Sequence, residues 1–257
     1  MSPSANESAW LYQWRALEDD SEMLFREWIQ PNRLEDFRGK SVLDGGCGGG
    51  SHLRIVAGYA AEVVGVDLTC AELAAERTRD LPNVSVQPAD LSTLDLGRQF
   101  DVVYSIGVLH HTDDPAKSFR SLARHVKPGG RLIVWVYAHE GNFWNRVLLE
   151  PLKRRVYGRW PRVVLMALSH VLTVLLYVPI YTVYLLPLRV LPFYDYFRNF
   201  RRLSYRRNLL NVFDKLNAPQ TRFLREDEVR SWFAEGFADV QVSPYVGVSW
   251  RATGVRI

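Results

Sequence analysis

Near its amino terminus the chain reads Val42-Leu43-Asp44-Gly45-Gly46-Cys47-Gly48-Gly49-Gly50-Ser51. An apolar pair ends in the carboxylate of Asp44, and five glycines follow within six positions. Only glycine lets a backbone turn this sharply from a strand into a helix and leaves room for a ligand to lie against the turn. Asp44 would repel a pyrophosphate, whereas it would favour a ligand that carries an ammonium group. These residues therefore predict a strand, a ligand-binding turn and a helix.

Two other nucleotide-binding turns fit the same glycines less well. A dinucleotide fingerprint, G-x-G-x-x-G, meets Ser51 at its last position when it starts at Gly46, and Cys47 at its third when it starts at Gly45. A phosphate-binding loop ends in Gly-Lys-Ser/Thr, and this loop does not. The alternative is a flexible turn that binds no ligand, and the residues that follow the glycines must distinguish the two.

Further apolar runs follow the glycines, separated by segments of helix length. They lie at 61–68, 84–87, 100–106 and 131–136. This alternation indicates an α/β fold, in which helices cover both faces of a parallel sheet. Near the carboxyl terminus the pattern adds one helix and two strands, at 225–235, 239–242 and 248–255.

Acidic residues stand at the ends of the second and third strands. Asp67 ends the second strand, 17 residues after Gly50, and Asp90 ends the third. A carboxylate at the end of the second strand suits a ribose, because it can accept hydrogen bonds from both hydroxyls. Together with Asp44, these acids predict a nucleoside ligand at the carboxyl edge of the sheet.

The spacing Asp-x-Gly-x-Gly-x-Gly, with the later acids in this order, resembles motif I and the following motifs of the class I S-adenosylmethionine (SAM) methyltransferases. The resemblance implies a Rossmann-like, seven-stranded, mostly parallel sheet, with SAM as cofactor and S-adenosyl-L-homocysteine as product. In that family the acid after the third strand accepts from the adenine amino group, and its apolar neighbour packs on the ring. The implied cofactor-binding residues are Asp44, Gly45, Gly46, Gly48, Gly50, Asp67, Leu68, Asp90, Leu91, Ser105 and Ile106.

The amino terminus predicts a helix that could cover the cofactor. Trp10, Leu11, Trp14 and Leu17 recur at helical spacing. In many small-molecule members of the family such a helix closes over SAM, and an aromatic side chain touches the sulfonium. Tyr12 and Trp14 are the candidates, because a cation over an aromatic face is favourable. Plain helix packing is the alternative for each of them.

The tip of the fourth strand carries the candidate catalytic residues. Residues 105–115 read Ser-Ile-Gly-Val-Leu-His-His-Thr-Asp-Asp-Pro. The V-L-H-H pattern resembles small-molecule methyltransferases of type 11, including the ubiquinone and menaquinone biosynthetic group. Histidine titrates near neutral pH, so His111, or else His110, could act as a general base; the alternative is that they only order the loop. The motifs that nucleobase methyltransferases use here are missing, so nucleic acid is an unlikely substrate, and we expect no metal.

Between the fifth strand and the carboxyl-terminal helix lie almost ninety residues, too many for a simple connection. Their charge is distinctive: 150–225 holds 14 Lys or Arg against three acids, a net +11, while the rest of the chain has 18 against 25, a net −7. We therefore expect an insert. The predicted organisation is a helical cap (1–35), a SAM-binding core (36–140), an apolar and basic insert (141–224), and the last helix and two strands of the core (225–257).

The centre of the insert, 163–188, has 26 residues without a single Asp, Glu, Lys or Arg. As one helix it would be roughly 39 Å long, enough to span a bilayer. Complete crossing is disfavoured, because strands before and after the insert must join one sheet and both flanks are basic. Pro179 and Pro187 favour shorter pieces. Three arrangements stay open: a membrane-surface contact through 150–210, a lid over an acceptor pocket, and a homodimer contact.

The bulk composition suits one core with an appendage. The chain has 257 residues, 47 % of them hydrophobic and 23 % charged. Its polar start is no signal peptide, and two cysteines make no disulfide framework, so we expect a cytoplasmic protein, with the membrane surface as a further candidate location.

The predicted activity is SAM-dependent methylation of a hydrophobic small-molecule or lipid-like acceptor, with oxygen favoured as the methylated atom. The first alternative is a C-methyltransferase of a prenylated quinone-type ring, which shares the V-L-H-H pattern. The second is a SAM-binding membrane or scaffold protein without turnover.

Overall fold

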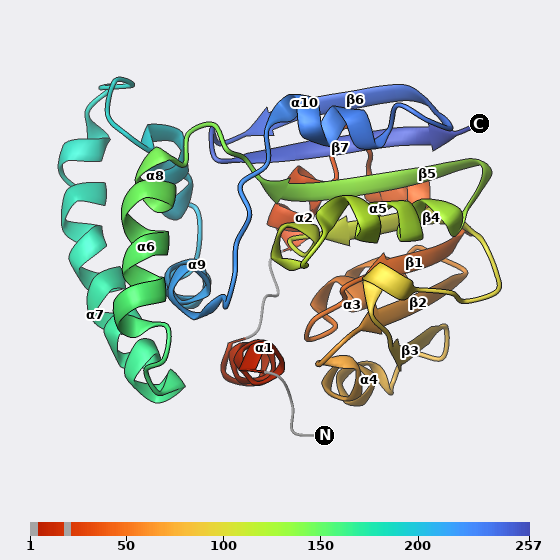
Figure 1. The fold of residues 1–257 in the computed structure, drawn as a ribbon, viewed down its shortest axis with the longest axis horizontal. Helices are drawn as coiled ribbons and strands as arrows, with labels where there is room; N and C mark the ends of the chain where they lie inside the picture. Colours follow the sequence, from red (N-terminus) through yellow and green to blue (C-terminus); the bar gives the residue numbers. More distant parts are fainter. Residues whose placement is uncertain (1–4, 18–21) are drawn as a thin grey trace.

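The computed structural model describes residues 5–17 and 22–257, with side chains from residue 9 onward (Figure 1). A seven-stranded sheet crosses the molecule in the order β3-β2-β1-β4-β5-β7-β6. The first five strands run parallel, and β7 is antiparallel to both β5 and β6. This confirms the predicted Rossmann-like, mostly parallel sheet. The strands are β1 (Ser41–Gly45), β2 (Glu62–Asp67), β3 (Val84–Pro88), β4 (Phe100–Ile106), β5 (Val126–Tyr137), β6 (Phe237–Tyr245) and β7 (Ser249–Arg256).

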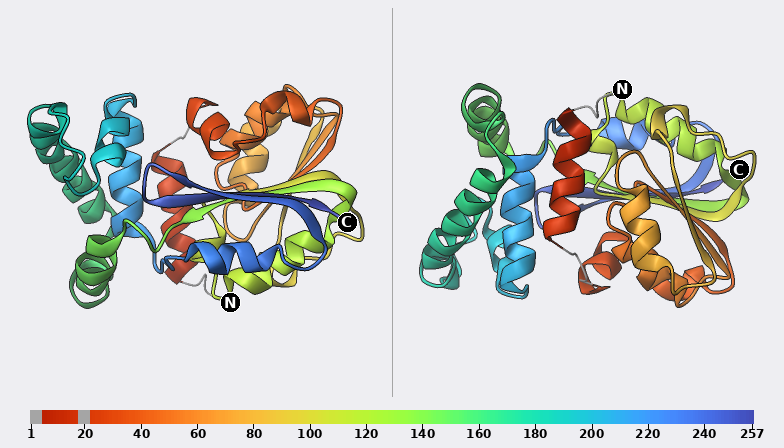
Figure 2. Two further views of the ribbon diagram at one scale, coloured as in Figure 1. Left: turned by 90° about the horizontal axis from the view of Figure 1, so that it is seen from above. Right: turned by 90° about the horizontal axis from the view of Figure 1, so that it is seen from below.

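Helices cover both faces of the sheet (Figure 2). On one face α2 (Glu22–Trp28), α3 (Ser51–Ala57) and α4 (Ala71–Thr78) contribute to a core that includes Phe25 and Val56. On the other face α5 (Pro115–Arg124) and α10 (Glu226–Trp232) bury Phe119 and Val229. Both faces of the central strands are therefore buried, which explains why they read as continuous apolar runs.

A helical layer lies between β5 and α10 in the sequence and beside the sheet in space (Figures 1 and 2). Its first helix runs from Asn145 to Tyr157, where α6 (Glu150–Leu152) is flanked by two π-helical turns. Next come α7 (Arg162–Ile180), α8 (Tyr194–Phe200) and α9 (Tyr205–Asn217). Pro179 lies in the last turn of α7, and the apolar run leaves the helix there, as a proline in this place favours.

The helix α9 lies between α7 and the sheet. It begins at Ser204, whose hydroxyl accepts a hydrogen bond from the backbone N–H of Arg207. Leu165 of α7 joins Leu209 and Phe213 of α9 in a separate apolar core. The amino-terminal helix α1 (Ala5–Ala16) packs on α9 as well. The helical layer and the amino-terminal cover therefore share α9 as their common support.

The two ends of the helical layer meet at the edge of the sheet. Ala138, just after β5, forms a parallel β-bridge with Leu224, just before α10. The backbone N–H of Leu224 donates to the carbonyl of Tyr137 (3.0 Å), and that of His139 donates to the carbonyl of Leu224 (2.7 Å). The chain thus leaves and rejoins the core at one point.

Candidate active site

The glycine loop between β1 and α3 adopts conformations that only glycine tolerates well. Gly46, Gly48 and Gly50 have φ of 95°, 52° and 85°. A Cβ added to Gly46 would lie 2.5 Å from a methyl group of Val108. The backbone N–H groups of Gly46 and Cys47 both donate to the carbonyl of Val66 on β2. The loop is therefore held open against the carboxyl ends of β1 and β2.

Asp67 closes the other side of this loop. Its Oδ2 accepts a hydrogen bond from the N–H of Gly48 (2.9 Å), and its Oδ1 accepts from those of Thr69 and Cys70 (both 2.9 Å). Each carboxylate oxygen can accept more than one hydrogen bond, so capacity remains for the two hydroxyls of a ribose. Asp67 lines the cavity described below, as a ribose-binding residue must.

Asp44 lies behind the loop. Its side chain is 1 % exposed, and its Oδ2 accepts no hydrogen bond within the described part of the chain. Burial raises the pKa of Asp44 to about 8, and the nearby charge of Asp67 adds to the rise. Ser105 is also buried, and its hydroxyl donates to the carbonyl of Gly45 (2.7 Å). Of the predicted cofactor residues, Asp44, Gly45 and Ser105 support the loop from beneath and Gly50 precedes the helix α3, and none of these four lines the cavity.

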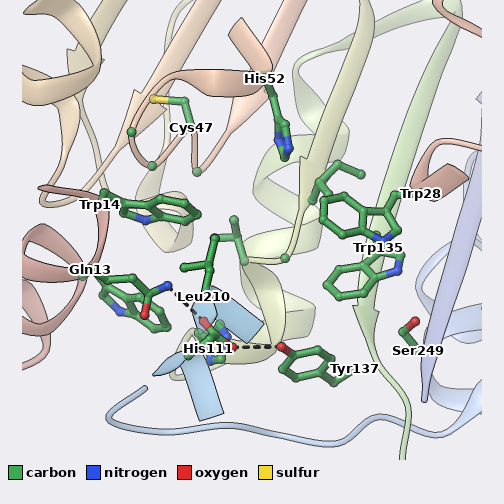
Figure 3. Close-up of a pocket in the computed structure, with 18 of the residues that line it drawn as sticks. Gln13, Trp14, Trp28, Cys47, His52, His111, Trp135, Tyr137, Leu210 and Ser249 are labelled. Carbon is green, nitrogen blue, oxygen red and sulfur yellow. Dashed lines mark hydrogen bonds between the residues drawn. The ribbon is translucent and has the colours of Figure 1, made fainter. Parts of the chain in front are cut away.

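A cavity of about 310 Å³ lies between the tips of the strands and the helical layer (Figure 3). Its cofactor end contains the predicted Gly46, Gly48, Asp67, Leu68, Asp90, Leu91 and Ile106. Asp90 uses one oxygen to accept from the N–H of Ser92 (2.7 Å). Leu68 leaves 56 % of its surface exposed, and Leu91 is buried beside Asp90. Two apolar side chains and a carboxylate at this end fit the ring and amino group of an adenine.

The helix α1 covers the cavity with two tryptophans. The indole of Trp14 lies against the glycine loop, where a Cβ on Gly48 would meet it at 2.9 Å (Figure 3). The ring of Trp10 lies 4.7 Å from that of His111. Tyr12 points elsewhere and packs against Phe213 of α9, at 5.9 Å between ring centroids. The structure therefore places Trp14 at the predicted cofactor site and Tyr12 outside it. Trp10 belonged to the same helical pattern, but nothing in the sequence distinguished it.

The two histidines at the tip of β4 have different environments. His110 is buried, and its Nδ1 accepts from the backbone N–H of Tyr137 (3.4 Å). His111 lines the cavity, and its Nδ1 lies 2.8 Å from the carbonyl oxygen of Gln220. A carbonyl can only accept, so Nδ1 of His111 carries the proton and the Nε2 of the neutral ring carries the lone pair. Burial lowers the pKa of both imidazoles, which keeps His111 neutral and able to act as a base.

A polar group from three elements stands beside His111. Asp214 of α9 accepts from the hydroxyl of Tyr137 (2.9 Å) and from the side-chain amide of Gln13 (3.1 Å), as Figure 3 shows in part. Burial acts to raise the pKa of Asp214, but the charges of His111 and Lys215 and these hydrogen bonds outweigh it and lower the pKa. Sequence reasoning missed this carboxylate, because one acid in a basic segment of the chain matches no motif.

The end of the cavity away from the glycine loop is aromatic. Trp28 and Trp135 lie 4.9 Å apart, and the guanidinium of Arg207 lies 5.2 Å from the ring of Trp28. The ammonium of Lys215 lies between the rings of Tyr137 (5.3 Å) and Tyr196 (5.0 Å). Cations over aromatic faces are favourable and keep such charges in a partly apolar site. The space suits an acceptor with a flat or apolar body.

Comparison with known proteins points to the same cofactor half. Residues 43–134 match the model of the Methyltransferase domain family. The chain is similar to the tRNA U34 carboxymethyltransferase of Pseudoalteromonas translucida, 34 % identical over 126 residues, which are 47 % of this chain and 38 % of the relative. It is also similar to the ubiquinone biosynthesis O-methyltransferase of Pseudomonas syringae pv. tomato, 40 % identical over 110 residues, 41 % of this chain and 47 % of the relative. These alignments span less than half of each curated relative.

Solved structures show the same fold over nearly the whole chain. Magnesium protoporphyrin IX methyltransferase from Synechocystis, solved with S-adenosyl-L-homocysteine, superposes with a TM-score of 0.55 at 16 % identity and covers 98 % of this chain and 96 % of its own. The N-methyltransferase NodS from Bradyrhizobium japonicum, solved with the same product, gives 0.54 at 12 % identity and covers 99 % of both chains. With the glycine loop and the acids at the strand ends, these findings show a methyltransferase domain at residues 43–134, within a chain that has the fold of class I SAM-dependent methyltransferases, and they support SAM as its cofactor.

Proposed function

We propose that the chain methylates a hydroxyl group of a hydrophobic small-molecule or lipid-like acceptor bound in the aromatic end of the cavity. The observation that carries this proposal is the state of His111. Its Nδ1–H is fixed on the carbonyl of Gln220, so a neutral Nε2 is left as a base in a cavity otherwise rich in aromatic side chains. A base is needed for a hydroxyl acceptor, because methylation of oxygen releases the hydroxyl proton.

When bound, SAM supplies an electrophilic methyl group, and the residues of the chain align the acceptor with it. His111 takes the hydroxyl proton on Nε2. Burial leaves the pKa of His111 lowered, and the buried charge of Asp214 opposes that lowering, so it favours the imidazolium that forms. Asp214 is itself held by Tyr137 and Gln13, so its position does not depend on the acceptor. The tryptophans of α1 line the cavity, and Trp10 lies beside His111.

The experiment is transfer of label from isotopically labelled SAM into an organic extract of cells, compared between the wild type and His111→Gln. We expect the variant to lose at least about 100-fold in rate while its affinity for SAM stays within about threefold. His170→Gln is the matched control, because His170 is exposed on α7, does not line the cavity, and contacts the ring and hydroxyl of Tyr205. A loss below about tenfold in His111→Gln would remove this residue as an essential base.

The product distinguishes the alternatives. Methyl on oxygen in the labelled product supports the proposal, whereas methyl on a ring carbon would favour the C-methyltransferase. Label in total tRNA, assayed separately in the aqueous phase, would instead indicate a nucleic-acid acceptor, the substrate class named for one of the relatives. Absence of labelled product from every extract, with SAM bound, would favour a scaffold without turnover.

A further inference from the structure

The helix α7 presents an apolar face to the outside of the molecule. Leu165, Ser169 and Thr173 are buried against the rest of the helical layer. The opposite side consists of aliphatic residues that are 44–68 % exposed: Val163, Val164, Val171, Val174, Leu175 and Val178. Surface helices of globular proteins normally carry polar residues there. Within the described chain α7 is the one helix long and apolar enough to cross a membrane by length and composition.

A second apolar stripe lies on the neighbouring helix 145–157 and its two flanks. Its members recur at every fourth position and are 41–56 % exposed: Trp144, Leu148, Leu152, Val156 and Trp160. Figures 1 and 2 place this helix and α7 at the same end of the molecule, on the side of α9 away from the sheet. We call the two stripes, with the exposed leucines and valines of 183–190, the outer apolar face. An exposed apolar area of this extent marks an interaction surface.

Basic side chains border the outer apolar face. Arg154, Arg155 and Arg159 are exposed beside the second stripe, and Arg189 is exposed in the loop after α7. Residues 141–204 contain ten Lys or Arg against two acids. One of these acids, Glu150, pairs with Lys153 at 2.6 Å. The surroundings of the face are therefore strongly positive.

We propose that the outer apolar face docks on the surface of an anionic lipid bilayer. Apolar side chains would enter the boundary between headgroups and acyl chains, and the arginines would meet the negative headgroups. Crossing is incompatible with the fold, because one side of α7 is buried on α9 and both ends of the layer return to the same edge of the sheet. A two-fold dimer through this face would bring arginines of one copy against arginines of the other.

The proposal does not depend on methyl transfer, so the test uses sedimentation of the full chain with vesicles. Vesicles of phosphatidylcholine and phosphatidylglycerol in equal parts are compared with vesicles of phosphatidylcholine alone, at low and at high salt. We expect the chain to sediment with the anionic vesicles at low salt, to stay in solution with the neutral ones, and to be released as salt rises.

Two pairs of variants separate the apolar from the charged contribution. Leu175→Asp introduces one acid into the face, and Ile257→Asp makes the same change at the exposed carboxyl terminus, at the far end of the molecule (Figure 1). We expect Leu175→Asp to weaken vesicle binding by about tenfold and the control to leave it unchanged. Both sites are exposed, so the fold should survive, and circular dichroism checks this.

The charge variants are Arg154→Gln combined with Arg155→Gln, and as control Arg120→Gln combined with Arg124→Gln, which lie exposed on α5. Each arginine near an anionic surface contributes about fivefold in affinity, so the first pair should weaken binding by about 25-fold and the control pair by much less. Equal loss in both pairs would mean that net charge alone governs binding, and would overturn the docking face.

Three further outcomes would also overturn the proposal. The first is wild-type chain that stays in the supernatant with anionic vesicles at low salt. The second is a dimer in solution that Leu175→Asp dissociates, without vesicle binding, because the face would then belong to a second copy. The third is binding of bulk tRNA that the Arg154 and Arg155 changes abolish, without vesicle binding, because the basic border would then serve RNA.

Discussion

Replacing Asp44 by asparagine should make the SAM-free chain more stable at neutral pH. The carboxyl is buried at the end of β1, and its pKa of about 8 lies far above the value of 3.8 for an exposed aspartate. Between these values the folded chain holds a proton that the unfolded chain has lost. Stability therefore falls as pH rises, by about 1.4 kcal/mol for each pH unit. Asparagine has nearly the same shape and no such proton.

Near pH 7, about three units above the pKa of this carboxyl in the unfolded chain, the buried carboxyl lowers the free energy of unfolding of the wild type by about 4 kcal/mol. The new amide offsets part of the gain, because a buried donor without a partner costs about 1–3 kcal/mol. The net gain of Asp44→Asn should thus be ~1–3 kcal/mol near pH 7, should vanish at about pH 4.5–6, and should turn into a loss of ~1–3 kcal/mol at about pH 4, where only the cost of the buried amide remains. Urea unfolding followed by tryptophan fluorescence over this pH range measures both numbers.

Asp101→Asn provides the opposite case. Burial acts to raise the pKa of Asp101, but Lys127 at 2.8 Å and the Ser41 hydroxyl and N–H outweigh it and lower the pKa. Its stabilisation is present at neutral pH and lost as pH falls, so this variant should be less stable near pH 7.

Two results would refute the reasoning on Asp44. One is a pH dependence of stability in Asp44→Asn that equals that of the wild type, and the other is a loss of stability in Asp44→Asn at neutral pH.

Three other changes test the loop and the acceptor end. Gly46→Ala should lower the free energy of unfolding by ~1–3 kcal/mol, because its Cβ would lie 2.5 Å from a methyl group of Val108. The control Gly39→Ala, at φ 68° with nothing within 4 Å of the added Cβ, should cost about 1 kcal/mol. Equal losses in thermal unfolding would contradict the steric reason. Asp67→Asn should weaken SAM binding about 10–100-fold in calorimetry, and the exposed Asp95→Asn should not change it; an unaltered affinity in Asp67→Asn would exclude the ribose contact. Asp214→Asn should lower the free energy of unfolding by ~1–3 kcal/mol at neutral pH. The stability difference from the wild type should close in acid, because the lowered pKa of Asp214 stabilises the fold only above the pKa of the unfolded chain. A stability difference that stays constant with pH would show that the charge of Asp214 plays no part.

The cofactor half could be predicted from sequence because its signals are local. The order strand, glycine turn, helix is written within residues 42–57, and each acid follows the apolar run that ends beside it. Positive φ at Gly46, Gly48 and Gly50 is a backbone requirement, so the residue type reports it directly.

The acceptor half could not be predicted in the same way, because its groups meet only through tertiary packing. Gln13 and Asp214 lie 201 residues apart in sequence, and Asp214 reaches Tyr137 from a helix with no motif of its own. The apolar run of α7 is compatible with a buried helix, a membrane span or a surface helix. Only the packing of Leu165 on α9 shows which side of α7 is buried and which is exposed.

The β-bridge between Ala138 and Leu224 means that the helical layer could be replaced as one unit. Because both of its ends are fixed at one point, the segment can lengthen, shorten or be replaced with little change in loop-closure entropy and without displacing β5 or β7. A graft of this segment onto a related core would need to match these two backbone hydrogen bonds and the contacts that Asp214 and Gln220 make with Tyr137 and His111. New acceptor chemistry could then arise by substitution of one contiguous stretch of gene, while the machinery for the methyl donor is inherited unchanged.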